Sequence, residues 1–171
     1  MAKIILLGYM GSGKTQTAKA LSLETGLPMI DLDARIEAQA GQSVTEIFQN
    51  EGEIRFRKRE HDLLAQLMQT NDSFILALGG GTPCYANNHR WLNGDGIASV
   101  YLKTSIDQLH HRLSSEKAHR PLIAQMDDGQ MKEFIAKSLF ERSYYYNQAT
   151  HTVQTDGRSP NETAREIAAL L

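Results

Sequence analysis

The sequence predicts an α/β fold built around a parallel β-sheet, and three observations lead to this prediction. About five short apolar runs alternate with longer segments of helical spacing, which is typical of strand–helix–strand units. A glycine-rich loop directly follows the first run, and a glycine triplet at residues 79–81 follows the most apolar one. Because ligands of such sheets bind beyond the carboxyl ends of the strands, both loops also indicate where a site lies.

The expected strands are short. Residues 74–78 read FILAL and are apolar throughout, as expected for a parallel strand that is buried on both faces. We expect strands at residues 3–7, 29–31, 74–78, 97–102 and 151–154.

The expected helices carry start and stop signals. Gly26 ends the first helix, and Ser43 and Ser159 each stand three residues before a glutamate, which is the capping-box spacing. Ser105 with Gln108 gives a similar start. We expect helices at residues 14–25, 34–40, 43–48, 53–68, 105–113 and 130–147, and a last helix that begins after Ser159.

Residues 114–126 interrupt this pattern because they are polar and have no clear period. We expect them to form a mobile lid over the site. Arg120 in this segment could reach the oxygens of a transferred phosphoryl group when the lid closes. The alternative is an ordinary surface arginine.

Composition limits the class of protein. The chain has 171 residues, 41% hydrophobic and 22% charged, and we expect one globular domain over residues 1–171. A formal net charge of −2 gives no basic field for nucleic acid or a membrane surface. The single cysteine, Cys84, excludes an internal disulfide, and no apolar run approaches the length of about 18 residues that a membrane helix needs. We therefore expect a cytoplasmic protein.

The first loop carries the most specific motif. Residues 8–15 read GYMGSGKT, which fits the phosphate-binding pattern GxxxxGK[ST] between a predicted strand and a predicted helix. In this setting backbone N–H groups and the helix N-terminus surround a phosphate, Lys14 reaches the β- and γ-phosphates, and the Thr15 hydroxyl can ligate Mg²⁺. The alternative is a glycine-rich turn that only connects the two elements.

Two aspartates follow the second predicted strand. If that strand lies near the first, Asp31 could hold Mg²⁺ directly or through water, and Asp33 could take the proton of an attacking hydroxyl. The alternative is that both acids simply cap the next helix.

A cluster of charges lies on the predicted helix at residues 53–68. Most such clusters are solvated helix faces. Arg57 stands out because Glu60, three residues later, could brace its guanidinium so that it grips a carboxylate with two hydrogen bonds.

The glycine triplet Gly79, Gly80 and Gly81 removes side chains at the end of a buried strand. It would let a ligand approach the backbone closely, although a flexible turn is the alternative. Other reactive residue types give weaker signals. Cys84 has no neighbouring base motif, the six histidines show no metal-ligand spacing, and the tyrosines at residues 144–146 are expected to pack rather than to stack on bases.

Taken together, these motifs resemble the shikimate kinase family over nearly the whole chain. The shared features are the loop at residues 8–15, Asp31-Leu32-Asp33, Ile47-Phe48, Glu51-Gly52-Glu53, Phe56-Arg57, Glu60, the glycine triplet, Arg120-Pro121-Leu122, and Glu141-Arg142 with a following tyrosine. The chain departs from the Arg-x-Pro-Leu-Tyr pattern common in the family, because Tyr144 and Tyr145 stand where proline and leucine are usual.

The resemblance implies a three-layer α/β/α P-loop kinase fold of the nucleoside-monophosphate-kinase type, with a five-stranded parallel sheet in the order 2-3-1-4-5. The family transfers the γ-phosphate of ATP to the 3-hydroxyl of shikimate, with Mg²⁺, in aromatic amino acid biosynthesis. The resemblance implies that the partners are small-molecule substrates and that the protein binds neither nucleic acid nor membranes. It also implies a monomer.

The resemblance also implies residue roles, with a substrate-binding segment at about residues 32–61. Substrate contacts fall on Asp33, Arg57, Gly79, Gly80, Gly81 and Arg142. Nucleotide contacts fall on Gly11, Ser12, Gly13, Lys14, Thr15, Gln16, Arg120 and Arg158. Asp33, Lys14 and Arg120 would act in the transfer, and Thr15 and Asp31 would hold Mg²⁺.

Two other functions stay open at this point. One is a different small-metabolite kinase of the same fold, such as a gluconate kinase, which would need no paired arginines for a cyclic carboxylate. The other is a nucleotide-dependent switch without metabolic turnover. The guanine-selective pattern Asn-Lys-x-Asp is absent from the sequence, which argues against a GTPase.

Overall fold

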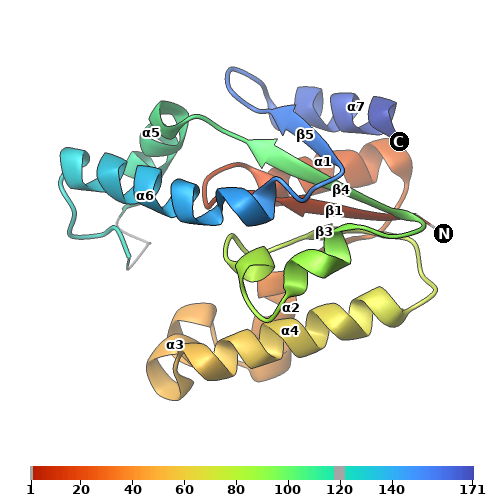
Figure 1. Ribbon diagram of the computed structural model, residues 1–171, viewed down its shortest axis with the longest axis horizontal. Helices are drawn as coiled ribbons and strands as arrows, with labels where there is room; N and C mark the ends of the chain where they lie inside the picture. The colour runs from red at the N-terminus through yellow and green to blue at the C-terminus, as the bar shows by residue number, and fades with distance from the viewer. Residues whose placement is uncertain (1, 118–121) are drawn as a thin grey trace.

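The computed structural model describes residues 2–117 and 122–171. Within these ranges five parallel strands form one sheet in the order β2-β3-β1-β4-β5, which confirms the expected order. Figure 1 labels four of them, β3, β1, β4 and β5. The strands are β1 Lys3–Leu7, β2 Met29–Asp31, β3 Phe74–Ala77, β4 Ile97–Lys103 and β5 His151–Gln154.

The described α-helices form two layers around the sheet. They are α1 Lys14–Thr25, α2 Leu32–Ala40, α3 Val44–Glu51, α4 Glu53–Gln69, α5 Ile106–Glu116, α6 Asp128–Tyr146 and α7 Pro160–Leu170. Helices α1 and α7 pack on each other over one face, whereas the buried residues of α4 and α6 share a second core with the opposite face.

The central strand β1 shows why the chain adopts three layers. Side chains alternate across a strand, and here both faces of β1 are apolar and buried. Ile4 and Leu6 belong to the core beneath α1 and α7, whereas Ile5 and Leu7 belong to the core shared with the opposite layer. A sheet buried in this way needs helices on both faces.

Most expected elements are confirmed to within a few residues. The capping boxes at Ser43 and Ser159 form as the spacing predicts. Helix α2 begins two residues earlier than expected because Asp31 caps it. Two 3₁₀ helices were not predicted, η1 Thr82–Cys84 and η2 Asn88–Leu92.

The predicted lid at residues 114–126 needs one correction. Helix α5 continues to Glu116, so the first three residues of the expected lid are helical. Arg120 and Pro121 lie outside the described residues. Across the described ranges, no helix combines the length and apolar character needed to cross a membrane.

Candidate active site

The loop at residues 8–13 joins β1 to α1 and adopts conformations that require glycine. Gly8, Gly11 and Gly13 have φ of 147°, 79° and 91°. A Cβ on Gly8 would also lie 2.8 Å from the carbonyl oxygen of Leu102 on β4. The loop therefore fits closely against its neighbours, and the Lys14 ammonium spans it by donating to the carbonyls of Gly8 at 2.8 Å and Tyr9 at 2.9 Å.

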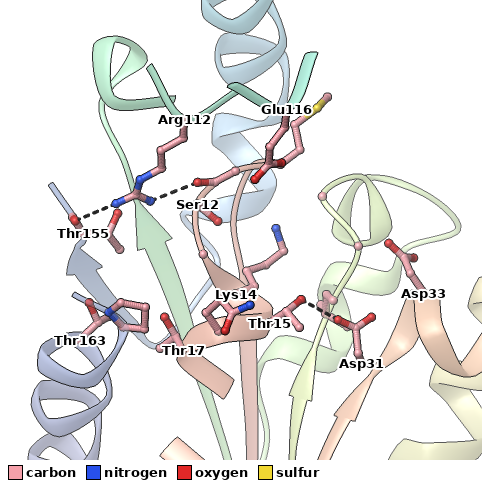
Figure 2. A pocket seen from close by; sticks show the side chains of 18 of the residues that line it. Ser12, Lys14, Thr15, Thr17, Asp31, Asp33, Arg112, Glu116, Thr155 and Thr163 are labelled. Atoms are coloured by element: carbon pink, nitrogen blue, oxygen red, sulfur yellow. Dashed lines mark hydrogen bonds between the residues drawn. The ribbon is translucent and has the colours of Figure 1, made fainter. Parts of the chain in front are cut away.

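A cavity of about 650 Å³ opens on this loop. Figure 2 shows Lys14 and Thr15 between Arg112 and Thr155 on one side and Asp31 and Asp33 on the other. The cavity is lined by the predicted nucleotide residues Gly11, Ser12, Gly13, Lys14, Thr15, Gln16 and Arg158, and also by Met10, Thr17, Gly79, Gly80, Arg112, Glu116 and Thr155. Its size and its glycine-rich floor suit a nucleoside triphosphate.

Arg112 is the main residue of this cavity that the sequence analysis missed. From α5 it donates to the carbonyl of Gly11 at 3.1 Å and to that of Thr155 at 3.3 Å. These bonds tie the phosphate-binding loop to the segment after β5. No local signal marks Arg112, because its partners lie 101 and 43 residues away in the chain.

Thr15 and Asp31 meet at the side of this cavity. The Thr15 hydroxyl donates to Asp31 Oδ2 at 2.7 Å, while Asp31 Oδ1 accepts the N–H of Ala34 at 3.2 Å. Asp31 therefore caps α2 and also faces the loop, so a role as a helix cap and a role as a Mg²⁺ ligand are compatible. A hydroxyl and one carboxylate fit Mg²⁺, which keeps several waters and takes its other ligands from phosphates.

A second cavity of about 490 Å³ adjoins the first. It is lined by Met10, Asp33, Val44, Thr45, Phe48, Gln49, Phe56, Arg57, Glu60, Gly79, Gly80, Gly81, Leu122 and Arg142. Met10, Asp33, Gly79 and Gly80 line both cavities. The two compartments therefore meet at Asp33, with the phosphate-binding loop in one and two arginines in the other.

Arg57 is held from several sides. Its Nη1 donates to Glu60 Oε2 at 2.8 Å, and its Nε donates to Glu53 at 3.4 Å. The ring of Tyr85 lies 4.0 Å from the guanidinium carbon, within the range of a cation–π contact. The expected brace by Glu60 is thus present, and the Glu60 side chain is only 1% exposed.

The rest of the charged cluster on α4 behaves differently. Lys58 pairs with Asp62 on the exposed side of the helix, and Arg59 pairs with Glu51 at the end of α3. These are surface ion pairs, which contribute little to stability. Of the basic residues in this cluster, Arg57 alone lines the second cavity.

The glycine triplet makes room for charged side chains. A Cβ on Gly79 would lie 2.9 Å from Asp33 Oδ1, one on Gly80 would lie 3.4 Å from Arg142 Nη1, and one on Gly81 would lie 2.7 Å from Arg57 Nη2. None of the three adopts a positive φ. Space, rather than backbone freedom, therefore requires glycine here.

Asp33 has an unusual environment. Burial raises the pKa of Asp33 to about 6, the carboxylates of Glu60 and Asp31 act in the same direction, and Lys14 and Arg57 oppose them. Its Oδ1 is buried and has no hydrogen-bond partner among the described residues. A carboxylate with a pKa near neutrality and an unpaired oxygen can accept a proton from a bound hydroxyl.

Three other residues that the sequence singles out, Tyr144, Tyr146 and Cys84, show no catalytic feature in the structure. Tyr146 is fully buried and donates its hydroxyl to the carbonyl of Gly80 at 2.6 Å, as expected for a packing residue. Tyr144 is 64% exposed, but its ring packs edge-on against that of Tyr145, with the ring centres 5.3 Å apart. Burial raises the pKa of Cys84 to about 11, which keeps the thiol protonated and agrees with the expectation that it is not a nucleophile.

Known proteins resemble this chain in sequence and in structure. The family model described as shikimate kinase matches residues 10–171. The chain belongs to the shikimate kinase family. Within this family, the shikimate kinase of Flavobacterium johnsoniae is 55% identical over 171 residues, which cover 100% of this chain and 99% of the relative.

Solved shikimate kinases have the same architecture. The 1.7 Å crystal structure of the shikimate kinase from Bacteroides thetaiotaomicron matches with a TM-score of 0.89 at 31% identity and covers 99% of this chain and 97% of its own. The shikimate kinase from Acinetobacter baumannii in complex with shikimate matches with a TM-score of 0.88 at 31% identity, over 99% and 92% of the two chains.

Proposed function

We propose that this chain is an ATP-dependent shikimate kinase that transfers the γ-phosphoryl group of ATP to the 3-hydroxyl of shikimate. The observation that carries the proposal is the pair of cavities that meet at Asp33. One has the phosphate-binding loop of a nucleotide site, and the other has two arginines suited to an acidic acceptor. The relatives at up to 55% identity that are named shikimate kinase support the same substrate.

In the proposed ground state, ATP lies in the first cavity with its phosphates on the N–H groups of residues 11–15. Lys14 stands at the loop, where it can reach the β- and γ-phosphates. Thr15 and Asp31 would hold Mg²⁺, which neutralises charge on the phosphate oxygens when it is bound.

Shikimate would lie in the second cavity with its carboxylate on Arg57 and Arg142. Both guanidiniums line this cavity, and the Arg142 carbon lies 5.2 Å from the centre of the Tyr9 ring, which helps to hold it. The hydroxyl of the acceptor would then face Asp33 at the junction of the compartments.

In the transfer step, the acceptor oxygen forms a bond to the γ-phosphorus of ATP. The bond between that phosphorus and the β,γ-bridging oxygen breaks, and ADP is the leaving group. The hydroxyl proton passes to Asp33. Lys14 stabilises charge on the transferred group. We propose the same role for Arg120, within a lid that begins after α5, at about residues 117–126.

The direct test is an assay of ADP formation with shikimate, gluconate and nucleoside monophosphates in turn. We expect turnover that depends on shikimate and at most weak turnover with the others. Turnover with gluconate would favour a different small-metabolite kinase. Bound ATP that none of the acceptors turns over would favour a nucleotide-dependent switch.

We also propose that the protein acts as a single-domain monomer in the cytoplasm and binds neither nucleic acid nor membranes. Light scattering at assay concentration, with and without both substrates, tests the monomer.

A further inference from the structure

Thr82 lies directly after the glycine triplet and begins the 3₁₀ helix η1. Its side chain is completely buried, and its hydroxyl donates to Glu60 Oε1 at 2.6 Å. The other oxygen of the same carboxylate, Oε2, accepts from Arg57 at 2.8 Å. Thr82 and Arg57 therefore divide one buried carboxylate between them.

The backbone of Thr82 is fixed on both sides. Its N–H donates to the carbonyl of Gly79 at 3.2 Å, and its own carbonyl accepts from Asn88 Nδ2 at 3.0 Å. Asn88 is also buried and bonds His61 Nδ1 through its Oδ1 at 2.7 Å. Since Glu60 and His61 are neighbours on α4, the bonds among Thr82, Asn88 and these two residues form a closed network. This network fixes the Thr82 hydroxyl beside Glu60 and away from other acceptors.

The position of this hydroxyl matters because a second carboxylate lies close by. Asp33 Oδ1, Thr82 Oγ1 and Glu60 Oε1 lie 2.9, 3.0 and 3.1 Å from the point that a Cβ on Gly79 would occupy. The Thr82 hydroxyl has one proton to donate, and it gives this proton to Glu60. Asp33 Oδ1 is left without a protein partner among the described residues.

We infer that Thr82 is a positioning residue for the acidic substrate: it holds Glu60 Oε1 so that Oε2 directs the Arg57 guanidinium into the second cavity. The inference rests on the proposed function. Within the described part of the chain, Arg57 Nη2 makes no hydrogen bond, so it is the nitrogen that remains for a substrate carboxylate.

Loss of the Thr82 hydroxyl has a specific consequence. A buried carboxylate oxygen without a donor is unfavourable, and among the described residues the other side chain that donates to Glu60 is Arg57. The carboxylate would then take both arginine nitrogens itself in a bidentate pair. Arg57 Nη2 would turn from the cavity toward Glu60, and the substrate would lose one of its two arginines.

The test is steady-state kinetics of Thr82→Val, which keeps the shape of the side chain, and Thr82→Ser, which keeps the hydroxyl. For Thr82→Val we expect the KM for shikimate to rise by about tenfold, whereas kcat and the KM for ATP should stay within about twofold of the unaltered values. The reason is that the lost contact holds shikimate equally in the ground state and in the transition state. Thr82→Ser should restore the KM for shikimate to near the unaltered value. Thr104→Val is the matched control, since it removes a buried hydroxyl whose 2.6 Å bond to Thr155 lies outside the second cavity.

The outcomes separate the two proposals. An unaltered KM for shikimate in Thr82→Val, or an equal rise in Thr82→Ser or Thr104→Val, overturns the role of Thr82 while the proposed function stands. Absence of shikimate-dependent turnover in the unaltered protein overturns the proposed function and this inference with it. If Thr82→Val does not fold, Thr82→Ala serves instead, because it lacks the same donor and has a smaller side chain. The expected result is again a raised KM for shikimate with an unaltered KM for ATP.

Discussion

Replacement of Asp33 by asparagine should make the protein more stable while it loses activity. The ionised Asp33 is unfavourable in the folded state because burial and two neighbouring carboxylates raise its pKa from 3.8 to about 6. A shift of this size corresponds to about 3 kcal/mol at neutral pH. Since Asp33 lines two open cavities where water screens it, we expect Asp33→Asn to gain about 2 kcal/mol at pH 7.5.

The sign and the pH window follow from the direction of the shift. Below pH 3.8 Asp33 is protonated in both the folded and the unfolded chain, so it carries no penalty there. As the pH rises toward about 6, the unfolded chain releases the proton first, and the penalty grows until it is complete. The advantage of the asparagine variant should therefore be small at pH 4 and full at pH 7.5.

Urea unfolding of both proteins at the two pH values, in EDTA and without ligands, measures this difference in free energy, and thermal unfolding under the same conditions measures the change in Tm. We expect a Tm about 4–8 °C higher for the variant at pH 7.5 and a kcat lower by about 10²–10⁴. Asp72→Asn, at an exposed position, is the control and should change the unfolding free energy by less than about 0.5 kcal/mol at either pH. A gain that is equal at both pH values, or a loss at pH 7.5, would refute the argument.

Three further predictions concern the two cavities. Arg57→Lys should raise the KM for shikimate by about tenfold or more in steady-state kinetics, because an ammonium cannot replace the planar guanidinium that Glu60 holds. An unchanged KM would show that Arg57 does not bind the substrate. Thr15→Val should raise the Mg²⁺ concentration needed for half-maximal rate, whereas Thr15→Ser should not, and an equal requirement in both would contradict the metal role of the hydroxyl. Gly81→Ala should also raise the KM for shikimate, because its Cβ would lie 2.7 Å from Arg57 Nη2. Gly129→Ala, at an exposed position near the start of α6, should leave this KM unchanged, and similar values for the two variants would show that the space beside Gly81 is not needed.

Local patterns in the sequence were sufficient for most of the fold. The phosphate-binding loop, the caps of α3 and α7, and the i, i+3 pair of Arg57 and Glu60 all depend on residues that are close in the chain. Their geometry is decided by short-range hydrogen bonds and by helical spacing. The order of the strands came from the family resemblance, because no local pattern specifies which strands pair.

The parts that the sequence did not predict depend on distant contacts. Arg112 reaches across 101 residues to the phosphate-binding loop, and Thr82 meets Glu60 across 22 residues. Neither residue has a neighbour in the chain that reveals its partner. The start of α2 was misplaced for a different reason, since Asp31 caps the helix and faces Thr15 at the same time.

The central claim is that an acidic acceptor lies beside the nucleotide and presents its hydroxyl to Asp33. A crystal structure with ADP, Mg²⁺ and shikimate tests it most directly. The account predicts shikimate in the second cavity, with its carboxylate on Arg57 and Arg142 and a hydroxyl within about 3 Å of Asp33. Shikimate bound elsewhere, or bound in that cavity with its carboxylate turned away from both arginines, would contradict it.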